Sequence, residues 1–206
     1  MSNPNIQKEA VFKLSYGLFV LTANDAGKDN GCIINTCIQT TENPTTVVIA
    51  VNKDGLTHDM VVKTKKFNLS IIDESAPMAL FEHFGFQSGK NVNKFENSVW
   101  GARKSENGVY YLSENVNAYI SGYVTDMIDM GTHTLFVATV VKAEKLADTA
   151  SATYDYYFKN IKPAPAPQAK GWICKICGYI YEGEELPADY ICPLCKHPAS
   201  DFEKIV

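Results

Sequence analysis

Short apolar runs, separated by clusters of turn-forming residues, fill most of the chain as far as residue 161. Runs rich in β-branched and aromatic residues and bounded by Gly, Pro, Asn or Asp are typical of strands. The stretch Asn24–Gly31 is dense in turn formers and lies between two of these runs, which predicts a hairpin. The runs predict strands at Gly17–Ala23, Cys32–Thr41, Thr45–Asn52, Phe67–Ile72, Val109–Leu112, Asn117–Met127 and Thr132–Lys145.

Helical signals are few and short. Ala10–Tyr16 predicts one helical turn, Thr57 is a good N-cap for a short helix, and a proline precedes another helix at Met78–Phe84. Gly85–Asn97 follows neither the helical nor the strand period, so we expect a functional loop there. Many strands and few helices predict a mainly β fold with short helices, built on a closed or partly closed β-barrel.

A change of composition divides the chain near residue 162. The aromatic cluster Tyr154–Ile161 ends the first part, and Lys162–Ala169 alternates proline with other residues. Alternating prolines keep a linker semi-extended, and at ~3.1 Å per residue this one would reach about 25 Å. We therefore expect a barrel domain at 1–161, a linker at 162–169 and a small module at 170–206, tethered rather than fused to the barrel.

Four of the six cysteines lie in the small module as two close pairs, Cys174/Cys177 and Cys192/Cys195. Each Cys-x-x-Cys turn brings two thiolates to one side of a loop, and two such loops supply four sulfur ligands in a tetrahedron, which selects iron or zinc. Two structural disulfides are the alternative, which the lack of a signal peptide disfavours. The module is too short to fold by apolar burial alone, so we expect its metal to stabilise it.

Residues around the cysteines fit this interpretation. Gly178 suits a turn with positive φ, which frees backbone N–H groups to point at the sulfurs, and Pro193 presets φ in the second loop. With its aromatic neighbours, the sequence from Gly171 to Ile205 closely resembles rubredoxin. The resemblance implies one iron that is held by the four thiolates and cycles between ferric and ferrous forms. A zinc ribbon is the alternative.

Two positions depart from free-standing rubredoxins. Only 14 residues separate the two cysteine pairs, which resembles the shorter form at the end of rubrerythrins. Lys196 stands where the family has a second glycine, so a left-handed conformation there would cost on the order of 1 kcal/mol. Neither departure removes a ligand.

Composition and charge exclude several other functions. Apolar residues make up 46% of the 206 residues, and the net charge is −4. The acidic excess is shared by both parts of the chain, so neither has the charge of a nucleic-acid-binding domain. No apolar run approaches the roughly 20 residues that span a bilayer, and Met1–Ala10 is too polar for a signal peptide. We expect a protein of the reducing cytoplasm, with no membrane or nucleic-acid partner.

A one-electron metal site needs an electron source, and the barrel offers residues for a cofactor phosphate. The first N–H groups of the helix that begins at Thr57 form an anion site, and Lys53 adds a positive charge. The irregular loop would complete the cradle with Ser88, Gly89 and Lys94. Either lysine of this site, taken alone, would be interpreted as solvated surface. His58 is expected to be exposed, and a contact with the phosphate is the alternative.

Four segments resemble, in order and spacing, the FMN-binding flavin reductases with a split β-barrel. They are Gly31–Pro44, Val51–Thr57, Phe84–Phe95 and Gly131–Phe136. The resemblance covers most of residues 10–145 and places Asn52, beside Lys53, among the cofactor-binding residues.

The family segment whose backbone lies along the flavin ring matches Ile34, Asn35, Thr36 and Cys37. Free backbone groups there would hydrogen-bond the pyrimidine edge of the flavin, and an ordinary buried strand is the alternative. His133 matches a Gly-Asp-His-Thr segment near the ring, with Thr132 in place of the acid. It is either a catalytic residue that helps to bind the hydride donor or a hydrogen-bonded core histidine.

The two remaining cysteines, Cys32 and Cys37, lie five residues apart on one predicted strand. They would then point to opposite faces about 16 Å apart, which is too far for a disulfide. We expect both to be small buried hydrophobes.

The order of barrel, proline linker and rubredoxin-like tail resembles the high-molecular-weight rubredoxins of anaerobes. The resemblance implies that NAD(P)H reduces FMN, that FMN passes single electrons to the iron, and that a flavodiiron protein accepts them to reduce oxygen or nitric oxide. It also implies a homodimer, because split-barrel relatives bind FMN between two subunits. A flavoredoxin-like carrier without nicotinamide activity and a flavin domain with a zinc-ribbon interaction module are the alternatives.

Overall fold

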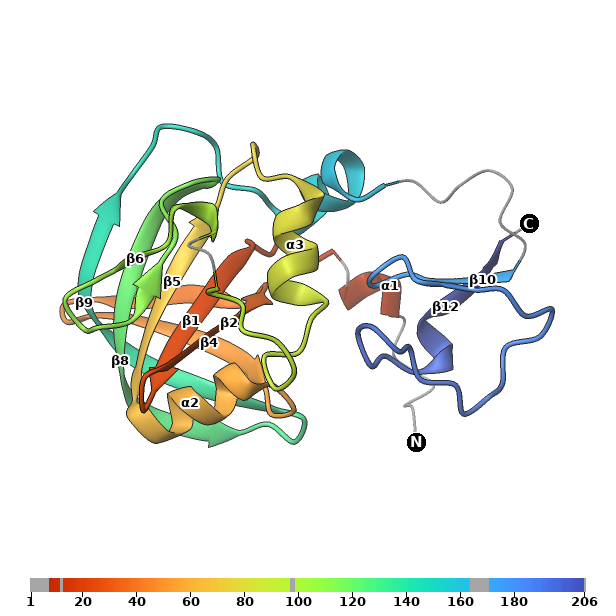
Figure 1. Ribbon diagram of the computed structural model, residues 1–206, viewed down its shortest axis with the longest axis horizontal. Coiled ribbons are helices and arrows are strands. Elements are labelled where there is room, and N and C mark those ends of the chain that lie inside the picture. Colours follow the sequence, from red (N-terminus) through yellow and green to blue (C-terminus); the bar gives the residue numbers. More distant parts are fainter. Residues whose placement is uncertain (1–7, 12, 97–98, 164–170, 206) are drawn as a thin grey trace.

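A curved, seven-stranded antiparallel sheet forms the larger part of the molecule (Figure 1). The computed structural model describes residues 8–11, 13–96, 99–163 and 171–205. The strand order is β2-β1-β5-β8-β9-β4-β3, which confirms the predicted mainly β fold. The strands are β1 (Phe19–Asp25), β2 (Lys28–Ile34), β3 (Cys37–Glu42), β4 (Thr45–Asn52), β5 (Lys66–Ile72), β8 (Val116–Asp129) and β9 (His133–Lys145).

The predicted hairpin forms with a tighter turn than expected. β1 and β2 pair from Phe19 opposite Ile34 as far as Asp25 opposite Lys28. Ala26 and Gly27 make the turn, with φ values of 49° and 84°. The polar residues that the sequence assigned to the turn therefore lie mostly within the strands, because strand pairing satisfies their backbone groups.

The predicted strand Cys32–Thr41 is wrong in one respect: it breaks at Asn35 and Thr36. β2 ends before these residues and β3 begins after them, at the opposite edge of the sheet beside β4. Cys32 and Cys37 therefore lie on different strands, so the predicted shared strand and separation do not apply. Both are free thiols that pack against the barrel core, half-buried rather than fully buried.

The long strand β8 bends so that it pairs with both β5 and β9. Its register against β9 shifts at Ser121/Gly122 and again at Val124/Asp126, and such bulges increase bending and twist. A Cβ atom at Gly122 would lie 2.3 Å from the Phe67 ring, which is fully buried. Only glycine lets the bent strand close over this ring.

The helices are short and pack on the sheet. α2 covers one end of the barrel, and Gly55 rather than Thr57 is its N-cap, so the predicted cap is wrong. The predicted turn at Ala10–Tyr16 forms in part: α1 ends at Val11, and the N–H groups of Lys13 and Leu14 donate to the carbonyls of Ala10 and Val11. No helix in the described part of the chain is long and apolar enough to cross a membrane. The helical segments are α1 (Lys8–Val11), α2 (Leu56–Thr64), α3 (Met78–Gly85), η1 (Val99–Gly101), α4 (Tyr154–Tyr156) and η2 (Tyr157–Ile161).

Two apolar clusters stabilise the barrel. One fills its interior, around Leu21, Ile49 and Phe136, and includes Met60 and Val61 of α2. The other lies where α3 and η2 cover the sheet. Its buried members include Leu80, Phe84 and Tyr157. The predicted strand Val109–Leu112 is shorter than expected. It forms β7 (Tyr110–Tyr111), which pairs with β6 (Arg103–Lys104) in a small two-stranded sheet.

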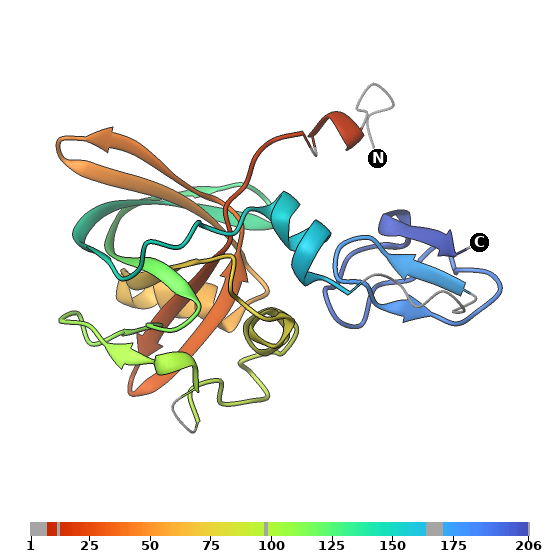
Figure 2. The same cartoon turned by 90° about the horizontal axis from the view of Figure 1, so that it is seen from above.

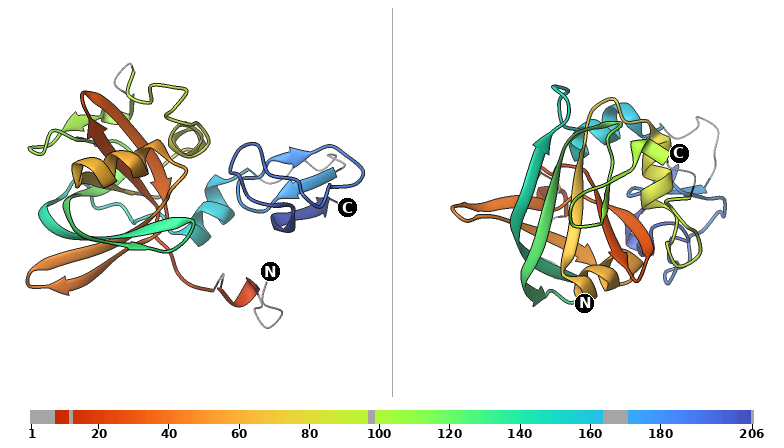
Figure 3. Two further views of the ribbon diagram at one scale, coloured as in Figure 1. Left: turned by 90° about the horizontal axis from the view of Figure 1, so that it is seen from below. Right: turned by 60° about the vertical axis from the view of Figure 1, so that its left-hand side comes forward.

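The C-terminal part folds as a separate three-stranded sheet in the order β11-β10-β12. Figures 2 and 3 show this module beside the barrel, with α4 and η2 between the two. Of the predicted linker, residues 164–169 lie outside the described residues, and the domain boundaries stay a prediction. The module is not detached, because Phe86 of the barrel packs against the cysteine cluster. Its elements are β10 (Gly171–Cys174), β11 (Ile180–Tyr181), η3 (Ala199–Asp201) and β12 (Phe202–Ile205).

Candidate metal centre and flavin site

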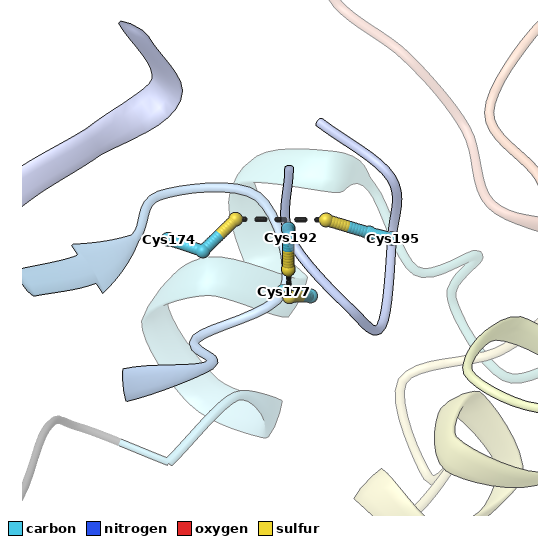
Figure 4. A group of neighbouring side chains, drawn as sticks. All are labelled: Cys174, Cys177, Cys192 and Cys195. Atoms are coloured by element: carbon cyan, nitrogen blue, oxygen red, sulfur yellow. Dashed lines mark hydrogen bonds between the residues drawn. The ribbon is translucent and has the colours of Figure 1, made fainter. Parts of the chain in front are cut away.

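The four cysteine sulfur atoms of the module face one another (Figure 4). The Sγ atoms of Cys174 and Cys195 are 3.5 Å apart, as are those of Cys177 and Cys192. All four sulfurs lie within 4.8 Å of one another, and each cysteine is a free thiol. This arrangement fits one tetrahedral metal ion and excludes the alternative of two structural disulfides.

The two cysteine loops have the same backbone geometry. The N–H of Gly178 donates to the carbonyl of Cys174 over 2.8 Å, and that of Lys196 donates to Cys192 over 3.0 Å. Gly178 has the positive φ that the sequence predicted, 81°, and Lys196 has φ of 63°. The lysine therefore adopts the left-handed conformation that its position implied.

Hydrogen bonds to sulfur favour the thiolate form that binds metal. The pKa of Cys174 is lowered, first by hydrogen bonds from Cys177 and Cys195, and also by the backbone amides of Cys177 and Ile176. The same contacts raise the pKa of Cys177 and Cys195, so the four thiols share their protons. Only the backbone amides can still donate when all four sulfurs bind metal, and these amides stabilise negative charge on Cys174 Sγ and so adjust the potential of a bound iron. Aromatic rings enclose the site: Tyr190 lies 4.7 Å from Tyr181 and 5.4 Å from Phe202, measured between ring centroids.

The first cysteine loop faces a cleft of the barrel. Ile176 and Cys177 line this cleft together with Cys195 of the second loop. The barrel contributes apolar and aromatic side chains, among them Ile33 and Phe86. Ile33 directly precedes the segment predicted to lie along a flavin ring. The metal centre and that segment therefore share one cleft, whose barrel walls are Leu18, Ile33, Phe81, Gly85, Phe86, Tyr154 and Tyr157.

The predicted flavin segment, Ile34–Cys37, is not a continuous buried strand. Ile34 is buried, whereas Asn35, Thr36 and Cys37 are half-exposed. Asn35 and Thr36 lie between β2 and β3, outside both strands, and the Thr36 carbonyl accepts a 3.4 Å hydrogen bond from the Ala50 N–H. Partly exposed backbone between two strands fits the edge of a flavin ring, which binds through backbone N–H and C=O groups.

The end of β4 lies beside His133, the predicted catalytic residue. Asn52 pairs with His133 in the β4–β9 ladder, and Lys53 Nζ forms a 2.6 Å ion pair with Asp129. The ring Nδ1 of His133 lies 2.9 Å from Thr132 Oγ1. The pKa of His133 is lowered, first by burial and then by the charge of His197, which belongs to the second cysteine loop. This loop is therefore close enough to His133 for their charges to interact.

Three predicted phosphate residues, Thr57, Gly89 and Lys94, converge on Asn30 and Gly31 of β2. The Asn30 side-chain amide donates to Thr57 Oγ1 over 2.9 Å, and a Cβ atom at Gly89 would lie 2.1 Å from Asn30 Oδ1. Lys94 Nζ donates to the Gly31 carbonyl over 2.9 Å and to the carbonyl of Phe84, at the end of α3, over 2.8 Å. These residues tie β2, α2 and the irregular loop together.

Lys94 is only 2% exposed, so the alternative of a solvated lysine is wrong for this residue. Burial lowers its pKa to about 8. Ser88, in contrast, is exposed at the surface of the same loop. Of the predicted phosphate residues in this loop, Ser88 is therefore the accessible one, while Lys94 Nζ is held by two backbone carbonyls.

The expectation that His58 is exposed is wrong. Its side chain is buried, and its ring Nε2 lies 2.8 Å from Thr134 Oγ1.

The two cysteines outside the module are poor nucleophiles. Burial raises the pKa of the Cys32 thiol, and it raises that of Cys37 to about 12. Both cysteines are therefore protonated and unreactive at neutral pH.

The family comparisons agree with this geometry. The family model described as flavin reductase like domain matches residues 11–165, and the rubrerythrin, rubredoxin-like domain matches residues 172–203. The chain belongs to the flavin reductase-like family. Its cofactors are a flavin in the flavin reductase-like barrel and one iron in the rubredoxin-like module.

Individual relatives share both parts or one of them. A high molecular weight rubredoxin from Moorella thermoacetica is 30% identical and covers 96% of this chain and 99% of its own length. A ferric-chelate reductase (NAD(P)H) from Archaeoglobus fulgidus is 35% identical, over 76% of this chain and 92% of its own. The solved NADH:FAD oxidoreductase of Streptomyces globisporus shares the barrel fold, with a TM-score of 0.63 at 19% identity over 74% of this chain and 91% of its own.

Sequence reasoning missed two residues of these sites. Asn30 falls within the stretch assigned to a turn, and nothing in the sequence indicates its contact with Thr57, 27 positions away. Lys162 was assigned to the linker, yet it contacts the first cysteine loop of the rubredoxin-like module. Its position between a helical segment and a run of prolines was the only available signal.

Replacing one ligand tests the metal centre. Cys192→Ala leaves three thiolates around the ion and should abolish stoichiometric iron binding together with the ferric–thiolate absorbance. The matched control is Cys37→Ala, which removes a thiol outside the module and should keep the iron. Iron analysis and visible spectra of the purified proteins give the answer, and a Cys192→Ala protein with full iron content would contradict the site.

Buried Lys94 should make stability depend on pH. Its pKa is about 8 in the folded chain, whereas an unfolded lysine titrates near 10.4, so the unfolded state binds more protons between these values. The free energy of unfolding should therefore rise with pH in this window, by about 3 kcal/mol. Below the window Lys94 is protonated in both states and should contribute no pH dependence.

Urea unfolding of the Lys94→Met variant, which lacks the titrating group, should not show this rise. Lys90→Met is the matched control, because Lys90 is an exposed lysine of the same loop and its loss should preserve the rise. Equal pH dependence of the two variants would contradict the prediction.

Proposed function

We propose that the protein passes electrons from NAD(P)H through FMN to its iron and on to a partner oxidoreductase. The observation that carries the proposal is the shared cleft: Ile33, next to the flavin segment, and the iron ligands Cys177 and Cys195 line the same space. Transfer between two centres in one chain requires such proximity. The proposal places this exchange in the reducing cytoplasm, where cysteine ligands stay available for metal.

The barrel residues have distinct roles in this proposal. FMN would supply the conversion from a two-electron donor to a one-electron acceptor. The backbone of Ile34–Cys37 orients the ring, and His133, beside Asn52, helps to bind the hydride donor. The phosphate-side residues are Asn52, Lys53, Thr57, Ser88, Gly89 and Lys94. Of these, Asn52, Lys53 and Ser88 are exposed or half-exposed, while Thr57, Gly89 and Lys94 hold the surrounding backbone in place.

The acceptor we propose is a flavodiiron protein that reduces oxygen or nitric oxide in an anaerobe. The second cysteine loop supports an external acceptor, because Ile191 and Leu194 beside it are 52% and 41% exposed. An apolar surface next to a redox centre suits transient docking of another protein. NAD(P)H is the donor in this scheme, and the ferric-chelate reductase relative carries that donor in its name.

A homodimer is part of the proposal. Large apolar side chains are exposed on neighbouring strands of the barrel, and the register places Ile38 opposite Val48 and Val48 opposite Val137. Patches of this kind mark interfaces. The most exposed members on β3, β8, β9 and the β8–β9 turn are 40% to 62% exposed: Ile38, Tyr123, Met127, Ile128, Met130 and Val141.

Anaerobic mixing with NADH or NADPH tests the electron path. The flavin absorbance should fall first and the ferric–thiolate absorbance second. Because both centres share one chain, the rate constant of iron reduction should stay the same over about a tenfold range of protein concentration. Cys192→Ala should retain the flavin phase and lose the iron phase. A flavin that dithionite reduces but neither nucleotide does would indicate an electron carrier without nicotinamide activity.

Sedimentation equilibrium tests the dimer. The native protein should have about twice the 22.8 kDa mass of one chain. Ile38→Lys, which puts a charge in the proposed interface, should shift the protein toward monomer. Val92→Lys is the matched control, since Val92 is 40% exposed in the irregular loop away from the patch. A native protein with the mass of one chain would rule out the dimer.

A further inference from the structure

Lys162, just after the last helical segment of the barrel domain, contacts the first cysteine loop. Its Nζ lies 3.3 Å from the carbonyl oxygen of Lys175 and 3.3 Å from that of Ile176. These two residues separate the iron ligands Cys174 and Cys177. A charged donor thus reaches the backbone between two ligands from the barrel side of the chain.

The lysine is anchored on that side at its backbone and along its side chain. Its N–H donates to the Tyr157 carbonyl over 2.8 Å and closes η2. Its Nζ lies 4.7 Å from the centroid of the Phe158 ring, within range of a cation–π interaction. Because η2 packs into the second barrel core through Tyr157, the ammonium group is held in a fixed relation to the barrel.

Gly178 makes room for this contact. A Cβ atom there would lie 3.0 Å from Lys162 Cε and 3.7 Å from its Nζ. The lysine stem therefore passes directly over the backbone that follows Cys177. Glycine thus has a second role at this position beyond its positive φ, because any side chain would press on the lysine.

The charge of Lys162 acts on the iron. A four-thiolate centre carries one more negative charge when its iron is ferrous than when it is ferric. A positive charge held beside the ligands therefore stabilises the ferrous form more and raises the reduction potential. Ferrous iron is the state that the flavin would generate.

We propose that Lys162 is a positioning residue of the iron module: it binds the first cysteine loop to the barrel, and its charge favours ferrous iron. The contact keeps Ile176 and Cys177 in the cleft that Ile33 lines. This role of Lys162 rests on the proposed flavin-to-iron transfer, because the contact would fix the geometry of that transfer. Its test measures the iron potential and the shape of the molecule, and neither measurement requires a nucleotide or a working flavin.

Lys162→Met keeps the length of the side chain and removes the charge and the donors. Potentiometric titration of the ferric–thiolate absorbance should show that the ferrous-to-ferric ratio at a given potential falls about tenfold, which is a shift of about 59 mV for a one-electron couple. Small-angle X-ray scattering of the same iron-loaded protein should show a larger maximum dimension, because the module is released from the barrel.

Lys159→Met is the matched control. Lys159 lies on the same helical segment, and its Nζ forms a 2.7 Å ion pair with Asp155. Its replacement therefore removes one positive charge of that segment and leaves the contacts of Lys162 with the cysteine loop in place. The potential and dimensions of this variant should stay those of the native protein. Lys162→Arg, which retains charge and donors, should keep most of the native potential.

The proposal is overturned if the Lys162→Met and Lys159→Met proteins have the same potential, or if their scattering curves coincide. An arginine variant whose potential falls as far as that of Lys162→Met overturns the role of the charge. Loss of iron from Lys162→Met would not block the test, because scattering of the zinc-loaded variant still compares its dimensions with those of the zinc-loaded control.

Discussion

The packing of the first cysteine loop against the barrel determines how the two redox sites are placed. Four thiolates within 4.8 Å of one another make the metal centre by themselves. The proposed electron path depends on the apolar cleft that Cys177 and Ile176 line together with Ile33 and Phe86. Apolar and aromatic side chains line this cleft on the barrel side, and Lys162 adds a polar contact beside it.

The barrel holds its side of the cleft through buried polar ties as well as apolar packing. Lys94 links β2 to the end of α3, and Asn30 links β2 to α2. A buried ammonium group is costly unless backbone acceptors surround it, so the loop that carries Lys94 can adopt few alternative conformations. The flavin segment begins three residues after Gly31, which accepts from this lysine. The irregular loop is thereby fixed to the strand that leads into the site.

The two cysteine loops differ in what they face, although their backbones are alike. The first loop places Ile176 and Cys177 in the barrel cleft, whereas the second places Cys195 there and exposes the side chains of Ile191 and Leu194. This asymmetry suits a carrier that receives electrons on one side and releases them on another. In the proposed function, this arrangement would let one small module serve an internal donor and an external acceptor without leaving the barrel.

The sequence alone determined the features that depend on local spacing. The cysteine pairs, the positive φ of Gly178, strand β4 and helix α3 all follow from neighbouring residues, because turn geometry and side-chain periodicity act over a few positions. The four flavin reductase-like segments likewise indicated the barrel family before their contacts were known.

Only the tertiary structure decided which distant residues meet. The break at Asn35 sends β3 to the far edge of the sheet, and no local signal marks it because both halves are equally suited to strands. Lys94 and His58 resemble surface residues in the sequence, but the fold buries them against partners 63 and 76 positions away. Lys162 resembles part of a linker for the same reason: its carbonyl partners belong to the first cysteine loop of the other module, and packing between the two parts, not local propensity, brings them together.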